Sequence, residues 1–169
     1  SIDLVTGRAG GNKVCLGVDV LDQRKMELLR FCAPVTLLAS GGGGQVYPNS
    51  TNPTVATGDG VAMAHRAHAV IANMEFVQFH PTGLYTSTTR GSSQRFLISE
   101  AVRGEGGHLL NLGGERFMSK YDERLELAPR DVVARCIDNE MKSRGDPHVW
   151  LDISHKPRDE IMEHFPNIA

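Results

Sequence analysis

The sequence predicts a fold of the mixed α/β class on three observations. Residues 35–40 (VTLLAS) form a continuous apolar run between a proline and four glycines, which is typical of a strand buried on both faces of a parallel sheet. Two later segments, beginning near residues 59 and 129, repeat apolar residues at helical spacing. The 169 residues, 40% hydrophobic and 22% charged, suffice for one ordinary domain or for parts of two.

Composition and charge argue against several classes of binding partner. The net charge is −2 with both signs interspersed, so no basic footprint for nucleic acid or an anionic membrane is present. No apolar run approaches the roughly 18 residues that a membrane span needs, and the first residues do not resemble a signal peptide. Cys15, Cys32 and Cys136 are odd in number and far apart, which favours free thiols in a reducing compartment. His65 and His68 have helical spacing, but no nearby carboxylate or thiol completes a metal set, so no metal is predicted.

The first 33 residues predict an antiparallel meander. Short apolar stretches at residues 2–5, 13–21 and 26–31 are separated by turn-forming residues at 8–12 and 22–25.

Four consecutive glycines, Gly41–Gly44, follow the predicted buried strand. Glycine loses more backbone entropy than any other residue in a helix or strand, so the run favours a loop whose backbone can approach a ligand closely. Open α/β sheets bind ligands beyond the carboxyl ends of their strands. The alternative is a flexible surface turn. The spacing matches neither GxGxxG nor the Walker loop, so this is not a primary phosphate loop.

The next helix is predicted to open at residues 57–60 (TGDG). Asp59 lies in its first turn, where a carboxylate suits the positive end of the helix. Asp59 either caps the helix or contacts a ligand.

Glu75–Gly83 (EFVQFHPTG) predicts a short strand that ends in a bend. Val77 and Phe79 alternate with polar residues, so one side of this strand is expected to pack. His80 is delivered into the bend that Pro81 fixes. The histidine either satisfies local hydrogen bonds or binds a ligand in a cleft.

The rest of the chain alternates loops, helices and strands. We expect a surface loop at Leu84–Gln94, a helix at Phe96–Arg103 and a hairpin at His108–Arg116. A strand at Val149–Ile153 and an amphipathic helix at Pro157–Phe165 follow.

The strongest helix signal begins at Pro129. Its apolar residues recur at three- and four-residue steps: Val132, Val133, Cys136, Ile137 and Met141. Arg130 therefore lies at a helix N-terminus, where a cation is disfavoured. Such local inconsistencies concentrate at functional sites. The alternative is a salt bridge to Asp131, Glu126 or another carboxylate.

Six blocks in order carry a family resemblance: LASGGGGQVY, TNPTVATGDG, MEFVQFHPTG, SEAVRGEGG, NLGGERFM and LAPRDVVAR. Together they resemble the flavoprotein family of succinate dehydrogenase, fumarate reductase and L-aspartate oxidase. YDERLELAPRDVVARCID and VWLDISHKP resemble its L-aspartate oxidase branch. A flavoprotein of the succinate dehydrogenase or fumarate reductase type is the nearest alternative. A non-catalytic remnant that serves as an interaction module is a second.

The resemblance implies an FAD-binding Rossmann-like domain interrupted by an α+β capping domain that closes over flavin and dicarboxylate. Residues 1–73 correspond to part of the FAD-binding domain, and residues 74–169 to most of the capping domain. The family's N-terminal dinucleotide fingerprint is not in this sequence. The chain is therefore expected to be an internal fragment that does not hold FAD tightly or act alone.

The resemblance also assigns residues to the cofactor. Ala39, Ser40, Gly41 and Gly42 match the strand end that runs beside FAD, with Ser40 where threonine is usual. Asp59 matches an FAD-contacting aspartate.

A second set of residues is assigned to substrate. His80 matches a histidine that hydrogen-bonds a substrate carboxylate, and Arg130 matches the active-site arginine. Ser99 and Glu100 match a threonine–glutamate pair whose hydroxyl helps to hold the same carboxylate. Serine keeps the hydroxyl but lacks the methyl group that stiffens the rotamer.

The implied activity is oxidation of L-aspartate to iminoaspartate, with hydride transfer to flavin N5, as the first step of quinolinate and NAD synthesis. Arg130 would stabilise charge first and transfer a proton second, because a guanidinium pKa above about 12 makes a poor base. Fumarate is a candidate electron acceptor, and quinolinate synthase a candidate functional partner. The bacterial cytoplasm and the plastid stroma both suit such an enzyme.

Overall fold

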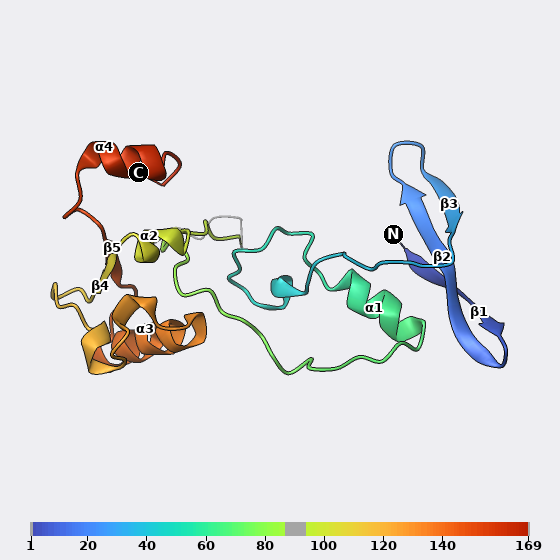
Figure 1. Cartoon of the computed structure of the whole chain (residues 1–169), viewed down its shortest axis with the longest axis horizontal. Coiled ribbons are helices and arrows are strands. Elements are labelled where there is room, and N and C mark those ends of the chain that lie inside the picture. The colour runs from blue at the N-terminus through green and yellow to red at the C-terminus, as the bar shows by residue number, and fades with distance from the viewer. Residues whose placement is uncertain (1, 87–93, 169) are drawn as a thin grey trace. The chain divides into compact units, whose positions relative to one another are not determined.

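The computed structural model describes residues 2–86 and 94–168 of the chain (Figure 1). The chain divides into two compact units, Ser1–Phe76 and Val77–Ala169. Each unit contains both helices and strands, in agreement with the predicted mixed class. No helix in the described ranges is both long enough and apolar enough to cross a bilayer.

The first unit begins with the antiparallel meander that the sequence predicts. Strands β1 (Asp3–Ala9), β2 (Asn12–Asp22) and β3 (Glu27–Cys32) pair in that order. Gly10 and Gly11 make the turn between β1 and β2 with φ angles of 57° and 84°. Both angles lie in the left-handed region that side chains rarely adopt, so this glycine pair fixes the turn and the register of the hairpin.

The prediction of a buried strand at residues 35–40 is wrong. The segment has no regular structure, and Val35 and Leu37 are 82% and 87% exposed. A strand buried on both faces needs a neighbour on each edge and cover on each face, and apolar composition alone supplies neither. The two sheets in the described part of the chain are antiparallel, and neither is the predicted parallel sheet. A short 3-10 turn, η1 (Gly44–Val46), follows.

Helix α1 (Asp59–Arg66) forms where its apolar spacing predicts. Met63 is only 1% exposed and anchors the helix in the first unit. In the last turn, Arg66 donates to the backbone oxygen of Ile2 at 2.9 Å and to the Asp3 carboxylate at 3.2 Å. These bonds tie the end of α1 to the start of β1.

The second unit packs on helix α3 (Arg130–Arg144), which begins directly after Pro129 as predicted. The buried core lies against one face of this helix and comprises Leu109, Phe117, Met118, Ala128, Val133, Cys136 and Ile137. Gly145 ends the helix in the left-handed conformation, with φ of 72°. All three cysteines are free thiols, and burial raises the pKa of Cys136.

Short elements complete the second unit. They are α2 (Ala101–Gly104), β4 (His108–Leu110), η2 (Met118–Lys120), η3 (Leu125–Leu127), β5 (Trp150–Asp152) and α4 (Arg158–His164). The strand predicted near residue 150 and the last helix are thus confirmed. The hairpin predicted at residues 108–116 is confirmed only as a turn: Leu110 and Arg116 form an isolated bridge, and β4 takes β5 as its strand partner.

The strand predicted at residues 75–83 is also wrong. Residues 75–82 form neither helix nor strand, and Gly83 makes one isolated bridge, to Leu97. Val77 and Phe79, which were expected to pack, are 47% and 55% exposed. Alternation of apolar and polar residues indicates a strand only where a second strand is available to pair with it.

The helix predicted at residues 96–103 shrinks to α2. Phe96 and Ile98 instead bond across to the bend after His80, with 2.9 Å from Leu84 N to Phe96 O and 3.0 Å from Ile98 N to Thr82 O. These long-range backbone bonds override the local helical spacing. Of the surface loop predicted at residues 84–94, residues 87–93 lie outside the described residues.

A buried carboxylate, Glu126, links three segments of the second unit. The residue is 2% exposed, and its oxygens accept from Arg116 at 3.0 and 2.6 Å and from Leu109 N at 3.0 Å. Its backbone oxygen accepts from Arg103 at 2.7 Å. Burial opposes ionisation, but the hydrogen bonds from Arg116 and Leu109 outweigh it and hold the pKa of Glu126 below its ordinary value.

We expect Glu126→Gln to lower the local stability of the Leu109 segment by about 1–3 kcal/mol at neutral pH, because an amide cannot accept from Arg116 through both of its atoms. The native carboxylate contributes above its unfolded pKa of about 4.3, and this contribution is lost as pH falls through the lower folded value. Hydrogen exchange of the Leu109 amide, followed against pH, measures both effects.

Glu123 provides the matched control, because this glutamate is exposed on the same loop. Glu123→Gln should change protection by less than about 0.5 kcal/mol. Equal protection of the Leu109 amide in both variants would contradict the role given to Glu126.

Candidate active site

His80 lies half-buried in the bend of the second unit, where the sequence places it. Its Nδ1 atom accepts a hydrogen bond from Thr82 N at 3.2 Å. Burial lowers the pKa of His80, the positive charges of Arg130 and Arg103 lower it further, and Glu100 opposes them. The imidazole is therefore neutral near pH 7 and retains one N–H donor.

The Glu100 carboxylate bridges two arginines. Oε1 accepts from Arg103 Nη2 at 2.9 Å, and Oε2 accepts from Arg130 Nε at 2.7 Å. Hydrogen bonding from Arg130, with the charges of both arginines, lowers the pKa of Glu100. The same contact raises the pKa of Arg130. Glu100 and Arg130 therefore remain charged across the physiological range.

Arg130 is the first residue of α3, so the unfavourable end of the helix is occupied by a cation, as predicted. The carboxylate of Glu100 offsets this cost, which confirms the alternative of a salt bridge to another carboxylate. The Arg130 side chain is 43% exposed and also lies 3.5 Å from Gln78 Oε1. A charged guanidinium thus stays accessible to solvent while its orientation is fixed.

Arg103 is the residue of this cluster that the sequence analysis misses. Arg103 is only 2% exposed, and its guanidinium donates to both the Glu126 backbone oxygen and the Glu100 carboxylate. The available signal was its position three residues after Glu100, the spacing at which a glutamate and an arginine pair on a helix. Its burial depends on the tertiary fold, and a buried guanidinium requires polar partners.

Ser99 lies beside Glu100, but its hydroxyl already has a local partner. Its Oγ accepts from Ala101 N at 3.2 Å at the start of α2. The hydroxyl hydrogen remains available, so the same side chain can still donate to a carboxylate oxygen. The four substrate-assigned residues, His80, Ser99, Glu100 and Arg130, thus all belong to the second unit.

The cofactor-assigned residues belong to the first unit. Gly42 O accepts from Gly58 N at 3.1 Å, which brings the glycine run against the loop that opens α1. A Cβ added at Gly43 would meet Gly58 Cα at 3.6 Å. The glycines therefore allow the backbone of the glycine run to approach the backbone of the TGDG loop. This approach brings Gly41 and Gly42 near Asp59, so these three cofactor-assigned residues belong to adjacent loops.

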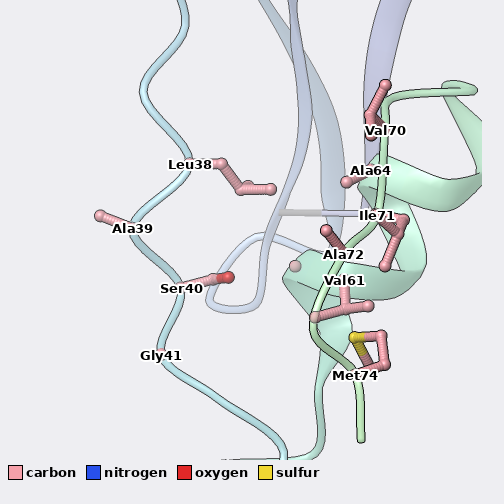
Figure 2. Close-up of a pocket in the computed structure, with 11 residues that line it drawn as sticks. Leu38, Ala39, Ser40, Gly41, Val61, Ala64, Val70, Ile71, Ala72 and Met74 are labelled. Carbon is pink, nitrogen blue, oxygen red and sulfur yellow. The ribbon is translucent and has the colours of Figure 1, made fainter. Parts of the chain in front are cut away.

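A shallow pocket of about 340 Å³ lies between residues 38–41, α1 and residues 70–74 (Figure 2). The Ser40 hydroxyl points toward α1, whereas Ala39 points away from it. A Cβ at Gly60 would lie 1.8 Å from Ser40 Oγ, so glycine at position 60 leaves room for the Ser40 hydroxyl in this orientation. Val61 and Met74 contribute to a mostly apolar lining.

Asp59 occupies the first turn of α1 and is exposed. Its carboxylate accepts from the Thr57 hydroxyl at 2.7 Å, a bond within the TGDG loop. No side-chain hydrogen bond caps this helix end. The remaining oxygen of Asp59 is therefore suited to accept from a ligand hydroxyl.

These residues fit FAD. A Cβ at Gly41 or Gly42 would meet nothing within 4 Å, so the peptide edge there is open to a flat, hydrogen-bonding ring system. Gly41 has φ of 75°, which favours glycine. Asp59 supplies a carboxylate acceptor on the neighbouring loop.

One group with metal-ligand geometry occurs among the residues the structure describes: Glu105, Glu160 and His164. Sequence spacing does not reveal it, because the glutamates are far apart in the chain. Lys156 Nζ already bonds both carboxylates, at 3.4 Å to Glu105 and 2.7 Å to Glu160. The cluster is an ion-pair network that holds α4.

The sequence is similar to curated proteins over its whole length. It is 62% identical to the chloroplastic L-aspartate oxidase of Arabidopsis thaliana, covering 100% of this chain and 27% of that protein. Identity to L-aspartate oxidase 1 of Ralstonia nicotianae is 55%, covering 99% of this chain and 31% of the relative. The chain thus spans less than a third of the length of these relatives.

The fold is similar to a solved structure, E. coli quinol fumarate reductase FrdA. The TM-score is 0.76 at 31% identity, with 96% of this chain and 29% of the other covered. The sequence profile of the family described as "FAD binding domain" matches residues 2–169. These findings confirm the resemblance that the six sequence blocks carry, with FAD as the cofactor. The chain belongs to the FAD-binding domain family.

Proposed function

We propose that this chain is part of an FAD-dependent oxidase that converts L-aspartate to iminoaspartate. One observation carries the proposal: Glu100 holds Arg130 in place, and the pKa of half-buried His80 is lowered first by burial and then by the charges of Arg130 and Arg103. This combination of a permanent cation and a neutral donor suits a dicarboxylate. The similarity to proteins named L-aspartate oxidase, up to 62% identity, favours aspartate over succinate.

The residues of the second unit would bind and orient the substrate. His80 donates an N–H to one carboxylate oxygen, and the Ser99 hydroxyl donates to the same group. Neutral donors suit this task because they hydrogen-bond a carboxylate oxygen and leave the negative charge of the substrate to pair with Arg130. Residues 74–169 would then act as the capping part of the enzyme, and residues 1–73 as part of its FAD-binding domain.

Arg130 would stabilise negative charge near the reacting carbon. Its pKa is raised by Glu100, so deprotonation is unfavourable and an electrostatic role comes first. Proton transfer is its second role, with the adjacent Glu100 carboxylate as the group able to take up a proton. The ammonium group of the substrate first loses a proton to give the amine; loss of a hydride from the α-carbon and of a second proton from the nitrogen then leaves the imine.

Residues 39–42 and Asp59 would hold FAD, which when bound supplies the acceptor for the hydride. The proposed reaction is the first step of quinolinate and NAD synthesis, with fumarate as an alternative electron acceptor and quinolinate synthase as the functional partner. Chloroplastic relatives reach 62% identity against 55% for a bacterial one, which favours the plastid stroma over the bacterial cytoplasm.

The first test is substrate choice by a full-length protein that contains this chain. It should show flavin absorbance and oxidise L-aspartate at least about 100-fold faster than succinate, because a site that bonds the amine loses that partner with succinate. Flavin-coupled oxygen or dye reduction measures both rates. Faster oxidation of succinate would favour the succinate dehydrogenase type, and a colourless protein would favour a non-catalytic remnant.

The second test addresses Arg130. Arg130→Lys keeps the positive charge but loses the planar fork that bonds Glu100, so turnover of L-aspartate should fall by about 100-fold or more. Steady-state kinetics with bound FAD verified by absorbance measures this loss.

Arg135→Lys is the matched control, because Arg135 lies on the same helix, is 70% exposed and pairs only with Asp131 among the described contacts. It should retain turnover within about twofold. Near-normal turnover by Arg130→Lys would remove Arg130 from the mechanism.

A further inference from the structure

Thr82 ties the bend after His80 to the segment before α2. The residue is 5% exposed, and its hydroxyl donates to Ile98 O at 2.9 Å. Its backbone oxygen accepts from Ile98 N at 3.0 Å, so the side chain and the backbone hold the same neighbour. Leu84 N adds a third bond, to Phe96 O at 2.9 Å. Thr82 is therefore fixed on both sides.

The fixed position of Thr82 aims its amide at the imidazole. Thr82 N donates to His80 Nδ1 at 3.2 Å. An N–H donor facing Nδ1 requires that this nitrogen carry a lone pair, because two facing hydrogens would repel. In the neutral ring the single proton must then reside on Nε2.

The Thr82 hydroxyl is a second group near the same nitrogen. Its Oγ1 lies 3.3 Å from His80 Nδ1. A hydroxyl has one hydrogen, and here that hydrogen is committed to Ile98 O. Toward Nδ1 the hydroxyl oxygen therefore offers a lone pair, which alone would suit an N–H there, whereas the amide can only donate and has the shorter contact, 3.2 Å. The amide is thus the group that favours an unprotonated Nδ1, and the hydroxyl acts through its bond to Ile98 O, which keeps the amide in place.

We propose that Thr82 is a positioning residue that locks His80 as its Nε2–H tautomer, so that Nε2 always presents a donor to a substrate carboxylate. The inference rests on the proposed function for the identity of the ligand, but the tautomer itself does not depend on it. Threonine suits the position because its hydroxyl and its amide act on two different neighbours.

The charges around His80 act in the same direction. Arg130 and Arg103 disfavour a second proton on the ring, while Glu100 favours it. Arg103 and Arg130 are both engaged by Glu100, so their positions are fixed relative to that carboxylate. The ring therefore remains neutral, and the amide of Thr82 decides which nitrogen carries the hydrogen.

Nitrogen-15 NMR of a full-length, histidine-labelled protein tests the tautomer directly. Two-bond ring correlations should show an unprotonated Nδ1 and a protonated Nε2 for His80, assigned by the signal lost in His80→Asn. This measurement needs no variant of Thr82 and no turnover. Protonation at Nδ1 in the unmodified protein would overturn the inference and leave the proposed reaction untouched.

Variants then test whether Thr82 imposes the tautomer. Thr82→Val keeps the shape but loses the bond to Ile98 O, so we expect a mixed tautomer, a rise of the His80 pKa toward its ordinary value and a KM for L-aspartate raised about tenfold with kcat little changed. Thr82→Ser keeps the hydroxyl and should restore all three readouts. Thr54→Val, at an exposed threonine, should change none of them.

A purely structural role for Thr82 would lower thermal stability in Thr82→Val but leave the ring correlations unchanged, and that result would overturn the inference. If the tautomer is as expected but His80→Asn binds L-aspartate normally, the substrate role of His80 fails instead. The spectra and the kinetics therefore separate the failure of the tautomer lock from the failure of the proposed function.

Discussion

The candidate site depends on one constraint, the burial of the Arg103 guanidinium. A buried cation needs charged or strongly polar partners, and here they are the Glu126 backbone and the Glu100 carboxylate. Because Arg103 fixes one oxygen of Glu100, the other is left to orient Arg130 at the start of α3. The position of an exposed arginine is thus determined by hydrogen bonds that begin in the core. Glu126 extends the same network to Arg116 and Leu109, so core packing and site geometry are not independent.

The parts of the fold that the sequence predicts well are those determined by neighbours in the chain. The Gly10–Gly11 turn fixes the first hairpin because no other residue adopts its backbone angles at so little cost. Helix α3 follows from its own apolar spacing, from Pro129 at its start and from Gly145 at its end. The two strands predicted at residues 35–40 and 75–83 fail for the opposite reason. A strand is defined by its partner, and a local pattern of apolar residues does not show whether a partner exists.

The residues of the candidate site likewise fall into those that the sequence identifies and those that only the structure identifies. His80, Ser99, Glu100 and Arg130 can be found because each lies in a motif with a recognisable order, and the structure places all four in the second unit. Arg103 and Thr82 lie in two of the same motifs, but the resemblance assigned them no role, and their importance lies in contacts with residues 16 to 23 positions away. Neither side chain is unusual in type. What distinguishes them is burial, which depends on the tertiary fold and not on the local sequence.

Burial first, and the charges of the cluster second, lower the pKa of His80 and favour the neutral ring. Two guanidinium groups and one carboxylate leave a net charge of +1 beside His80. The proposed substrate, L-aspartate, carries two carboxylates and one ammonium group near pH 7, and its net charge of −1 would be balanced by the cluster. A protonated imidazole would add a second net charge and would direct an N–H at the amide N–H of Thr82, with the Thr82 hydroxyl oxygen at 3.3 Å as the acceptor beside it. The electrostatics of the cluster and the amide of Thr82 therefore both favour a neutral ring with its proton on Nε2. In this state the arginines supply positive charge, and His80 supplies a directed N–H donor.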